Sequence, residues 1–343
     1  MQVDTVRISL PLKKEFVTSR GSARVKTNFL TILNNRYSGE ASSSVAYGPT
    51  ADEIGADLQR GIELLGKEKQ IDIETLENIG GFDIHPVVRS ALSAMVLNYL
   101  SGESGKYPWE VLEIGGPVGV KSSITVSIGK DPAKVIEAVQ QSPYPIVKVK
   151  LGTDKDPEVI AMIGDISDKT IRVDANGAWS CERAEEMIFH LARAGITVIE
   201  QPTDASSIKD WPNLKGKNEK VVLLMDEGLS TVEDYQAHRE YVDGINIKME
   251  KSGGIIEALK IARQARVDGK KVMLGCMVES SVGIAQSIYM SSMADYHDLD
   301  GPQLLETDIA SGIKYDRESI EVDCEIIGGP KLRREIVERF IEE

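Results

Sequence analysis

Cysteines are few in this chain of 343 residues, and long apolar runs are missing from it. The three cysteines, Cys181, Cys276 and Cys324, are odd in number and far apart, which disfavours a disulfide framework and fits a reducing compartment. No stretch reaches the roughly 18 consecutive apolar residues that suggest a membrane span. The first residues lack the basic-then-apolar order of a signal peptide. We therefore expect a cytoplasmic protein.

Positive charge and aromatic side chains are also in short supply. The 40 Lys and Arg residues are outnumbered by 54 Asp and Glu residues, so the net charge is -14 at pH 7, and aromatics make up 5% of the chain. An acidic surface repels nucleic acid and anionic membranes, so we expect neither as a partner. A homo-oligomer is compatible with this composition. No Gly-x-Gly-x-x-Gly motif follows a strand, which disfavours a dinucleotide-binding Rossmann fold.

What the sequence does contain is a regular series of apolar strands that end in charged residues. Lys148, Asp174, Glu200 and Asp226 follow one another at steps of 26 residues (148 to 174, 174 to 200, 200 to 226). Such a step holds one strand, one helix and two short connections. Equal steps therefore predict parallel strands whose charged ends meet at one edge.

The same alternation of strand and helix extends over residues 121–312. Eight apolar stretches read as strands: Ile124–Ile128, Ile146–Leu151, Ile171–Asp174, Val198–Glu200, Val221–Asp226, Ile245–Met249, Val272–Met277 and Tyr296–Asp300. Seven amphipathic helices fill the gaps, which predicts an α/β fold with a (β/α)7β TIM-type barrel and an active site at the carboxyl ends of the strands. Residues 1–120 read as an α+β capping domain. The tail 313–343 alternates like strand, and we expect it to return to that domain.

Three of the strand-end residues are carboxylates. Asp174, Glu200 and Asp226 each close an apolar strand, and no Cys or His shares their register. A set of hard oxygen ligands suits Mg²⁺, with Mn²⁺ as a substitute. The alternative is that these acids only cap helices or form ion pairs. Their equal register favours a metal site.

Lysines accompany these acids on two strands. Lys148 and Lys150 alternate with valines, so both side chains point into the barrel. Crowding by Lys148 and a metal ion should lower the pKa of Lys150 toward that of a useful base. Lys248 closes the sixth strand, opposite the second, so a base stands on each face of the metal. For Lys248 the alternative is a structural salt bridge, and we expect Lys251, a rival to Lys248, to lie on the surface.

Together these motifs resemble the enolase superfamily in its muconate-lactonizing-enzyme subgroup. The residues that carry the resemblance are Lys148-Val-Lys150, Asp174-Ala-Asn176-Gly, Glu200-Gln-Pro202, Asp226-Glu-Gly and Asn246-Ile-Lys248 followed by Lys251-Ser-Gly-Gly254. The resemblance spans nearly the whole chain. It implies a capping domain over a (β/α)7β barrel, Mg²⁺ held by the three carboxylates, and proton transfer by Lys150 and Lys248 beside Lys148.

Two further motifs resemble the dipeptide epimerases of that subgroup, such as the L-Ala-D/L-Glu epimerases. They are Gly275-Cys-Met-Val-Glu-Ser-Ser281 and His297-Asp298-Leu-Asp300-Gly. The resemblance implies that Asp298 and Asp300 bind the free ammonium group of a dipeptide, and alternation sends both to one side. It also implies substrate contacts from Thr125 and from the backbone of Cys276, Met277 and Val278. Arg20 lies in the lid loop 16–23, where relatives carry an arginine.

The expected reaction is epimerisation of a dipeptide by an isomerase. A proton would leave and return at the α-carbon of the C-terminal residue through an enediolate. The alternatives are a cycloisomerase or an o-succinylbenzoate-synthase-like dehydratase on the same scaffold, a non-catalytic dipeptide-binding relative, and a Schiff-base aldolase. Asp298 and Asp300 disfavour the first two, because an aromatic acid offers nothing for two carboxylates to bind. The sequence leaves the preferred dipeptide open.

Overall fold

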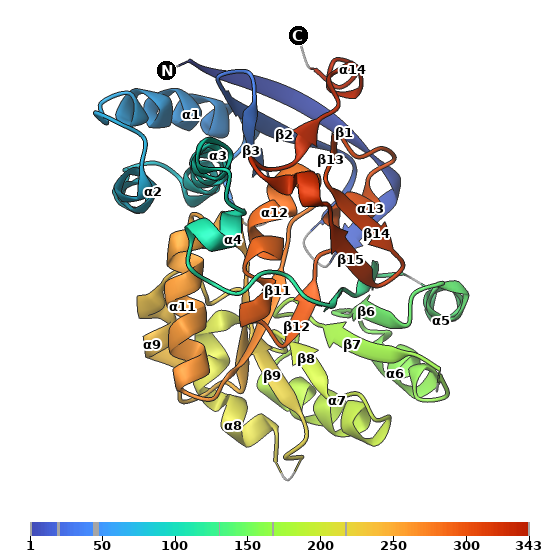
Figure 1. Cartoon of the computed structure of the whole chain (residues 1–343). Helices are drawn as coiled ribbons and strands as arrows, with labels where there is room; N and C mark the ends of the chain where they lie inside the picture. Colours follow the sequence, from blue (N-terminus) through green and yellow to red (C-terminus); the bar gives the residue numbers. More distant parts are fainter. Residues whose placement is uncertain are drawn as a thin grey trace.

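The computed structural model describes residues 2–18, 21–43, 48–129, 131–166, 168–216 and 218–341. It consists of a barrel, an antiparallel sheet with helices above it, and a C-terminal tail (Figure 1). No helix within these ranges is both long and apolar enough to cross a membrane.

Eight parallel strands form the barrel, and each is hydrogen-bonded to the next in chain order. They are β5 (Ile124–Val126), β6 (Ile146–Lys150), β7 (Thr170–Asp174), β8 (Val198–Glu200), β9 (Val222–Met225), β10 (Gly244–Ile247), β11 (Lys271–Gly275) and β12 (Tyr296–Asp298). Bridging between Ser122 and His297 brings the first and last strands together. The predicted barrel is confirmed.

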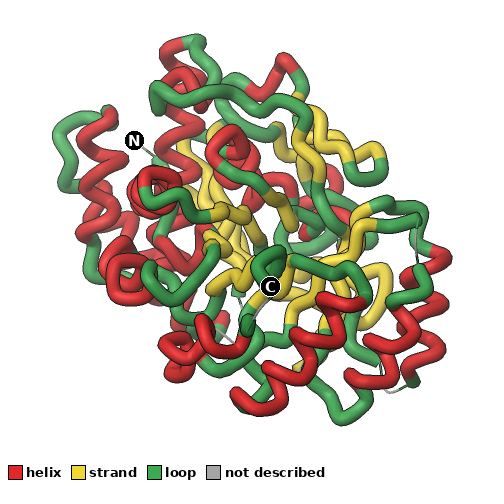
Figure 2. Tube along the Cα trace, turned by 90° about the horizontal axis from the view of Figure 1, so that it is seen from below, coloured by secondary structure: helices red, strands yellow, loops and turns green. Residues whose placement is uncertain are grey.

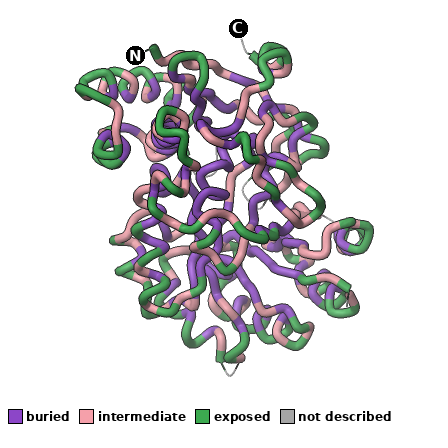
Figure 3. The backbone as a smooth tube through the Cα atoms, in the orientation of Figure 1, coloured by how far each residue is buried: buried purple, intermediate pink, exposed green. Residues whose placement is uncertain are grey.

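Helices surround these strands, as the view from below shows (Figure 2). They are α5 (Pro132–Gln141), α6 (Asp156–Ile163), α7 (Cys181–Arg193), α8 (Trp211–Leu214), α9 (Val232–His238), α10 (Met249–Ser252), α11 (Ile255–Val267), α12 (Ser281–Tyr289) and α13 (Gly301–Leu304). Side-chain caps set several of their starts; Ser180, for example, accepts a hydrogen bond from the backbone N–H of Arg183 at the start of α7. Buried residues are concentrated along the barrel axis and at the junction with the sheet above (Figure 3).

The N-terminal sheet has two faces with different partners. Its strands are β1 (Val3–Thr18), β2 (Gly21–Leu33) and β3 (Tyr37–Ser42), and the helices beside it are α1 (Ala51–Leu65), α2 (Ile73–Asn78), α3 (Pro86–Ser104) and α4 (Pro108–Val111). Phe29 and Leu33 of β2 belong to the core that includes these helices. Leu30, whose side chain points the opposite way, packs with Val278 and Leu305 from the barrel side. One face of the sheet therefore rests on the barrel.

The C-terminal tail lies beside the N-terminal sheet and the segment that precedes the barrel (Figure 1). Its elements are β13 (Ala310–Ser311), β14 (Ile313–Asp316), β15 (Ser319–Val322), β16 (Lys331–Leu332) and α14 (Arg334–Val337), and β15 pairs with β4 (Val120–Lys121). The backbone N–H of Ser9 donates to the carbonyl of Phe340 at 2.7 Å. These contacts support a capping domain built from both ends of the chain, while its boundaries at 120 and 312 stay a prediction.

Candidate active site

Strand register brings the predicted site residues to one edge of the barrel. Lys150 pairs with Asp174, and Asp174 pairs with Glu200, along three neighbouring strands. Asp226 directly follows β9 and Lys248 directly follows β10. The three carboxylates are at most 1% exposed. The steps of 26 residues thus correspond to side chains that meet in space.

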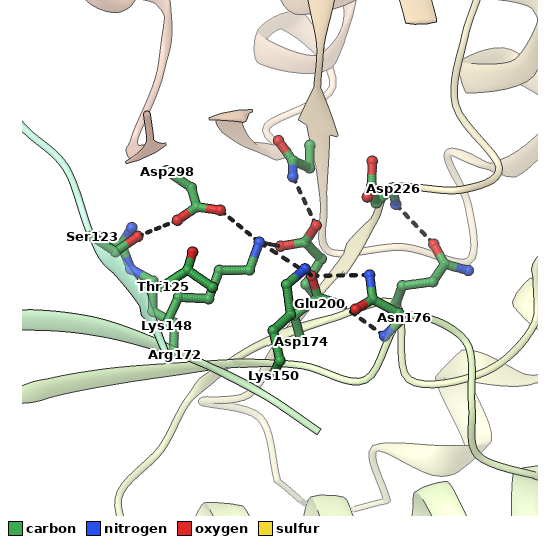
Figure 4. Close-up of polar contacts among 12 residues, drawn as sticks. Ser123, Thr125, Lys148, Lys150, Arg172, Asp174, Asn176, Glu200, Asp226 and Asp298 are labelled. Atoms are coloured by element: carbon green, nitrogen blue, oxygen red, sulfur yellow. Dashed lines mark hydrogen bonds and ion pairs between the residues drawn. The ribbon is translucent and has the colours of Figure 1, made fainter. Parts of the chain in front are cut away.

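Lys148 lies at the centre of this group (Figure 4). Its Nζ is 2.6 Å from Oδ2 of Asp298, 2.7 Å from Oε2 of Glu200 and 3.2 Å from Oδ2 of Asp174. Burial alone would lower the pKa of Lys148, but the three carboxylates raise it well above its usual value. Lys148 therefore keeps its positive charge and offsets part of the acidic cluster.

The other two predicted lysines contact different carboxylates. Nζ of Lys150 is 2.6 Å from Oδ2 of Asp174, and Nζ of Lys248 is 2.7 Å from Oδ2 of Asp226. The order of strands places these lysines on opposite flanks of Glu200. Lys251 also bonds to Oδ1 of Asp226, with its side chain only 10% exposed, so the expectation that it lies on the surface was wrong. The short helix α10, which follows β10, brings Lys251 back to the carboxylate of Asp226.

The pKa values of the three acids are shifted in different directions. Burial would raise the pKa of Asp174, but Lys150 and Lys148 lower it to about 2. Glu200 is different, because burial and then the charge of Asp174 raise its pKa to about 8. Burial also opposes ionisation of Asp226, yet Lys248 and Lys251 hold its pKa well below its usual value. Negative charge is thus crowded around Glu200.

The donor set of the three carboxylates fits Mg²⁺ in its chemistry. All three are buried oxygen ligands on consecutive strands, and Asn246 orients Glu200 by donating to its Oε1 at 2.8 Å. In this arrangement lysine ammonium groups lie between the carboxylates. Accordingly, no three acidic, His or Cys side chains among the described residues converge closely enough to hold an ion. The ammonium groups of Lys150 and Lys248 would have to move off Asp174 and Asp226 for a metal to bind.

Asp298 and Asp300 lie together at the end of β12 but differ in their partners. Oδ1 of Asp298 accepts from the hydroxyl of Ser123 at 2.6 Å, while its Oδ2 contacts Lys148. Oδ2 of Asp300 accepts from the backbone N–H of Thr125 at 2.7 Å. Burial and the nearby charge of Asp298 raise the pKa of Asp300 to about 6. Asp300 is therefore the less neutralised carboxylate of the two.

The loop after β11 carries the other residues expected to contact substrate. Met277 lines a pocket of about 200 Å³ together with Glu250 and Lys251. Val278 packs against the N-terminal sheet, and its carbonyl accepts from Nδ2 of Asn28 at 3.2 Å. Burial raises the pKa of the Cys276 thiol well above its usual value, which disfavours a thiolate nucleophile. Arg20 lies outside the described residues.

The sequence analysis assigned no role to several buried polar residues of the site, although two of them lie in its motifs. Asn246 lies two positions before Lys248, so the alternation of a strand could have indicated it. Gln201 accepts from the backbone N–H groups of Asp226 and Glu227 through Oε1. No pattern in the sequence marks this role, nor that of Ser123.

Comparisons with known proteins agree on one family. Residues 131–312 match the model described as "Enolase C-terminal domain-like". The chain is 31% identical over 323 residues to an L-Ala-D/L-amino acid epimerase of Maribacter sp., covering 92% of this chain and 94% of that protein. It is 32% identical to an L-Ala-D/L-Glu epimerase of Bacteroides thetaiotaomicron, covering 80% and 73% of the two chains.

Solved structures superpose over almost the whole chain. A dipeptide epimerase from Cytophaga hutchinsonii, complexed with Mg and the dipeptide D-Ala-L-Val, is similar with a TM-score of 0.87, 25% identity, and coverage of 98% of this chain and 97% of that one. The muconate lactonizing enzyme of Pseudomonas fluorescens is similar with a TM-score of 0.88, 22% identity, and coverage of 99% and 98%. The fold of a capped barrel is thus shared with both.

Proposed function

The chain belongs to the enolase superfamily, and we propose that it is a Mg²⁺-dependent dipeptide epimerase, an isomerase that inverts the α-carbon of its substrate's C-terminal residue. The main support is the position of Lys150 and Lys248, which approach a row of buried carboxylates from opposite flanks. Inversion needs one group to remove a proton and another to return it on the other face. Two lysines so placed meet this requirement.

Each residue has a distinct part in this proposal. Lys150 and Lys248 exchange the α-proton at their Nζ atoms, one on each face of the substrate. Mg²⁺ held by Asp174, Glu200 and Asp226, with Mn²⁺ as a substitute, would stabilise the negative charge that develops on the substrate carboxylate. Lys148 stays protonated and limits the repulsion among the acids.

Asp298 and Asp300 would hold the substrate's N-terminal ammonium group at the other end of the site. Because Lys148 already offsets the charge of Asp298, Asp300 would provide most of the attraction. Thr125 and the backbone of Cys276, Met277 and Val278 would line the path between this end and the metal. Arg20 stays a proposed lid contact on the strength of the sequence resemblance alone.

The other functions considered from the sequence receive less support. A cycloisomerase or a dehydratase acting on an aromatic acid would leave Asp298 and Asp300 without a cationic ligand. A non-catalytic binding protein would not need both Lys150 and Lys248. A Schiff-base aldolase would use Lys150 or Lys248 as its one imine-forming lysine and would not need both beside a row of buried carboxylates. We also keep the cytoplasm as the proposed location, on the basis of the few cysteines.

A library of L,L-dipeptides incubated with the protein in heavy water tests the proposal. With Mg²⁺ present, we expect deuterium at the α-carbon of the C-terminal residue and the appearance of the second epimer, both followed by mass spectrometry and chiral chromatography. A parallel incubation with EDTA should show neither. Absence of exchange in every dipeptide would refute the function, and exchange that is unaffected by EDTA would refute the role of the metal.

A further inference from the structure

A pocket lies where the C-terminal tail meets the turn between β2 and β3. Its volume is about 320 Å³, which is within the range of small-molecule sites. The turn supplies Arg36, and the tail supplies Lys331 and Arg334. Nη2 of Arg334 donates to the carbonyl of Asn35 at 3.0 Å, which joins two segments 299 residues apart. The pocket is therefore built from both ends of the chain.

This pocket is remote from the candidate active site. The opposite end of the β1–β2 hairpin reaches the barrel mouth, where the backbone N–H of Ile128 donates to the carbonyl of Val17 at 3.2 Å. From that end, β2 runs for 13 residues to Leu33, at the turn that carries Arg36. At about 3.3 Å per residue, the two ends of β2 lie on the order of 40 Å apart. A ligand in the pocket would therefore not be a substrate bound at the barrel strand ends.

The charges that line the pocket are unbalanced. Arg36, Lys331 and Arg334 carry three positive charges, and Glu338 is the one acid among the described lining residues. Three positive charges against one negative charge leave an excess of two. Within the parts of the chain that the structure describes, none of the three cations forms an ion pair. In a chain with a net charge of -14, the pocket is thus a local site of positive charge.

Most hydrogen-bond donors of these cations are not used by the described residues. The guanidinium carbon of Arg36 lies 5.0 Å from the centre of the Tyr37 ring, and its N–H groups make no hydrogen bond there. Lys331 donates once, from Nζ to the carbonyl of Ile327 at 2.8 Å. Burial and then the charge of Arg36 lower the pKa of Lys331, so the two cations are close enough to repel each other. An anion between them would relieve this repulsion and accept hydrogen bonds from the remaining donors.

Apolar side chains form another part of the pocket wall. They are Ile32, Leu332 and Val337. Val337 is buried, and the other two are half-buried against the same core cluster, which holds this wall in place. A small hydrated ion would leave these side chains without contacts. The wall therefore favours an anion that carries an apolar body.

We propose that this pocket binds the phosphate group of a small phosphate monoester, whose apolar body packs on the wall. The excess of two positive charges matches a phosphate monoester, which carries about -1.5 to -2 charge at pH 7, better than it matches a single carboxylate. Guanidinium groups also suit phosphate, because their N–H donors pair with its oxygens. The pocket lies at the other end of the sheet from the barrel mouth, so its ligand is independent of the proposed epimerase function.

Isothermal titration calorimetry with three probes tests this site. The probes are phenyl phosphate, inorganic phosphate and benzoate, which has the ring of phenyl phosphate but only one negative charge. The proteins are the wild type, Arg36→Gln, Lys331→Gln, Arg334→Gln and the control Lys314→Gln. Lys314 is a lysine of the tail outside the pocket, with its side chain 70% exposed. All titrations contain the same concentration of MgCl2 and have the same ionic strength.

The wild type should bind one phenyl phosphate per chain, about 10-fold more tightly than benzoate. Each pocket variant should bind phenyl phosphate about 10-fold more weakly, because each loses a charge-assisted hydrogen bond. Lys314→Gln should bind it like the wild type. Arg36→Lys should keep part of the affinity, since it keeps the charge. The side chain of Arg36 makes no hydrogen bond to the described residues, so both of its variants should fold, which circular dichroism checks.

Four results would overturn the assignment of this pocket. Equal affinity of the wild type and all three pocket variants would place the phosphate elsewhere, such as on a metal ion at the barrel mouth. Absence of binding by both phosphate probes would show that the pocket is not a phosphate site. Benzoate binding as tight as that of phenyl phosphate would remove the argument from charge. Equal affinity for inorganic phosphate and phenyl phosphate would show that the apolar wall contributes nothing.

Discussion

Nζ of Lys148 lies 2.6 Å from Oδ2 of Asp298, and this contact joins β6 to β12, the strands on either side of β5. The same ammonium group reaches Glu200 and Asp174, so one buried cation contacts three buried acids and offsets part of their charge. Removing one partner of a buried ion pair leaves uncompensated charge in a poorly solvated place. The stability of the barrel mouth therefore depends on Lys148.

Lys148→Met should lower the free energy of unfolding by about 3–5 kcal/mol. The methionine fills similar volume, so most of the loss comes from the unpaired carboxylates. Urea unfolding without Mg²⁺ measures this difference in the free energy of unfolding. Lys155→Met is a matched control, because Lys155 forms an ion pair of similar length, 2.7 Å, with Glu158 on the surface. That change should cost far less stability, because both side chains of this pair are exposed to solvent; equal losses in the two variants would contradict the assigned role of Lys148.

Lys150→Ala and Lys248→Ala should each reduce epimerisation by at least about 100-fold, because each removes one of the two groups that exchange the α-proton. Each variant keeps the lysine on the other face. Solvent deuterium should therefore enter at most one epimer, and the two variants should differ in which one. NMR of each epimer in heavy water follows this exchange. Retention of full epimerase activity by either variant would rule out the two-base arrangement.

Glu40 connects the N-terminal sheet to a barrel helix and should make stability depend on pH. It accepts hydrogen bonds from the backbone N–H groups of Ser280 and Gly283 at the start of α12. Burial raises its pKa from 4.5 to about 7, and the charge of Asp308 adds to the rise. The folded protein thus binds a proton more tightly than the unfolded chain does, so this contribution to stability is lost as pH rises from about 4.5 to 7.

Glu40→Gln should flatten this dependence, because glutamine keeps an oxygen acceptor without a titrating proton. The shift corresponds to about 3 kcal/mol between the ends of that pH range. Urea unfolding of both proteins at pH 5, 6, 7 and 8 checks the expectation. The stability of the variant relative to the wild type should be highest above pH 7. Parallel curves for the two proteins would show that Glu40 does not titrate in this range.

Much of the site could be predicted from strand patterns, because neighbouring parallel strands with equal spacing must align their ends. Asp174, Glu200 and Lys150 came together for that reason alone. Lys251 could not be placed in this way, since its contact with Asp226 depends on the short helix α10 after β10. The Glu40 contact with Ser280 spans 240 residues and depends on how the sheet sits on the barrel. Local patterns contain no information about such docking.

The contact between Lys148 and Asp298 could not be predicted from the sequence either, and it distinguishes Asp298, in β12, from Asp300, which follows this strand. Alternation predicts that Asp298 and Asp300 share one side, and the resemblance implies that both bind the substrate. Lys148 comes from a strand 150 residues earlier and takes one oxygen of Asp298. The different partners of the two aspartates therefore follow from tertiary structure.

Asp300→Asn should weaken recognition of a free N-terminus. The wild type should favour a dipeptide with a free ammonium group over its N-acetylated form, because the acetyl group removes the charge that Asp300 attracts. In the variant the ratio of kcat/KM for the two forms should fall by about 10-fold or more. Steady-state assays with matched free and acetylated dipeptides measure the ratio. An unchanged ratio would place the ammonium group elsewhere.

Mg²⁺ should stabilise the protein through Asp174, Glu200 and Asp226. A ligand that binds only the folded state at about 100 times its Kd adds about 2.7 kcal/mol of stability. Thermal unfolding with and without MgCl2, at equal ionic strength, should therefore show a higher Tm with the ion. Asp226→Asn and Asp174→Asn should each lose this shift, since each removes a charged ligand. Glu158→Gln changes an exposed residue on α6 and controls for weak binding of Mg²⁺ to an acidic surface. This variant should keep the rise in Tm. If both site variants responded to Mg²⁺ as strongly as the wild type, the ion would not be bound by these carboxylates.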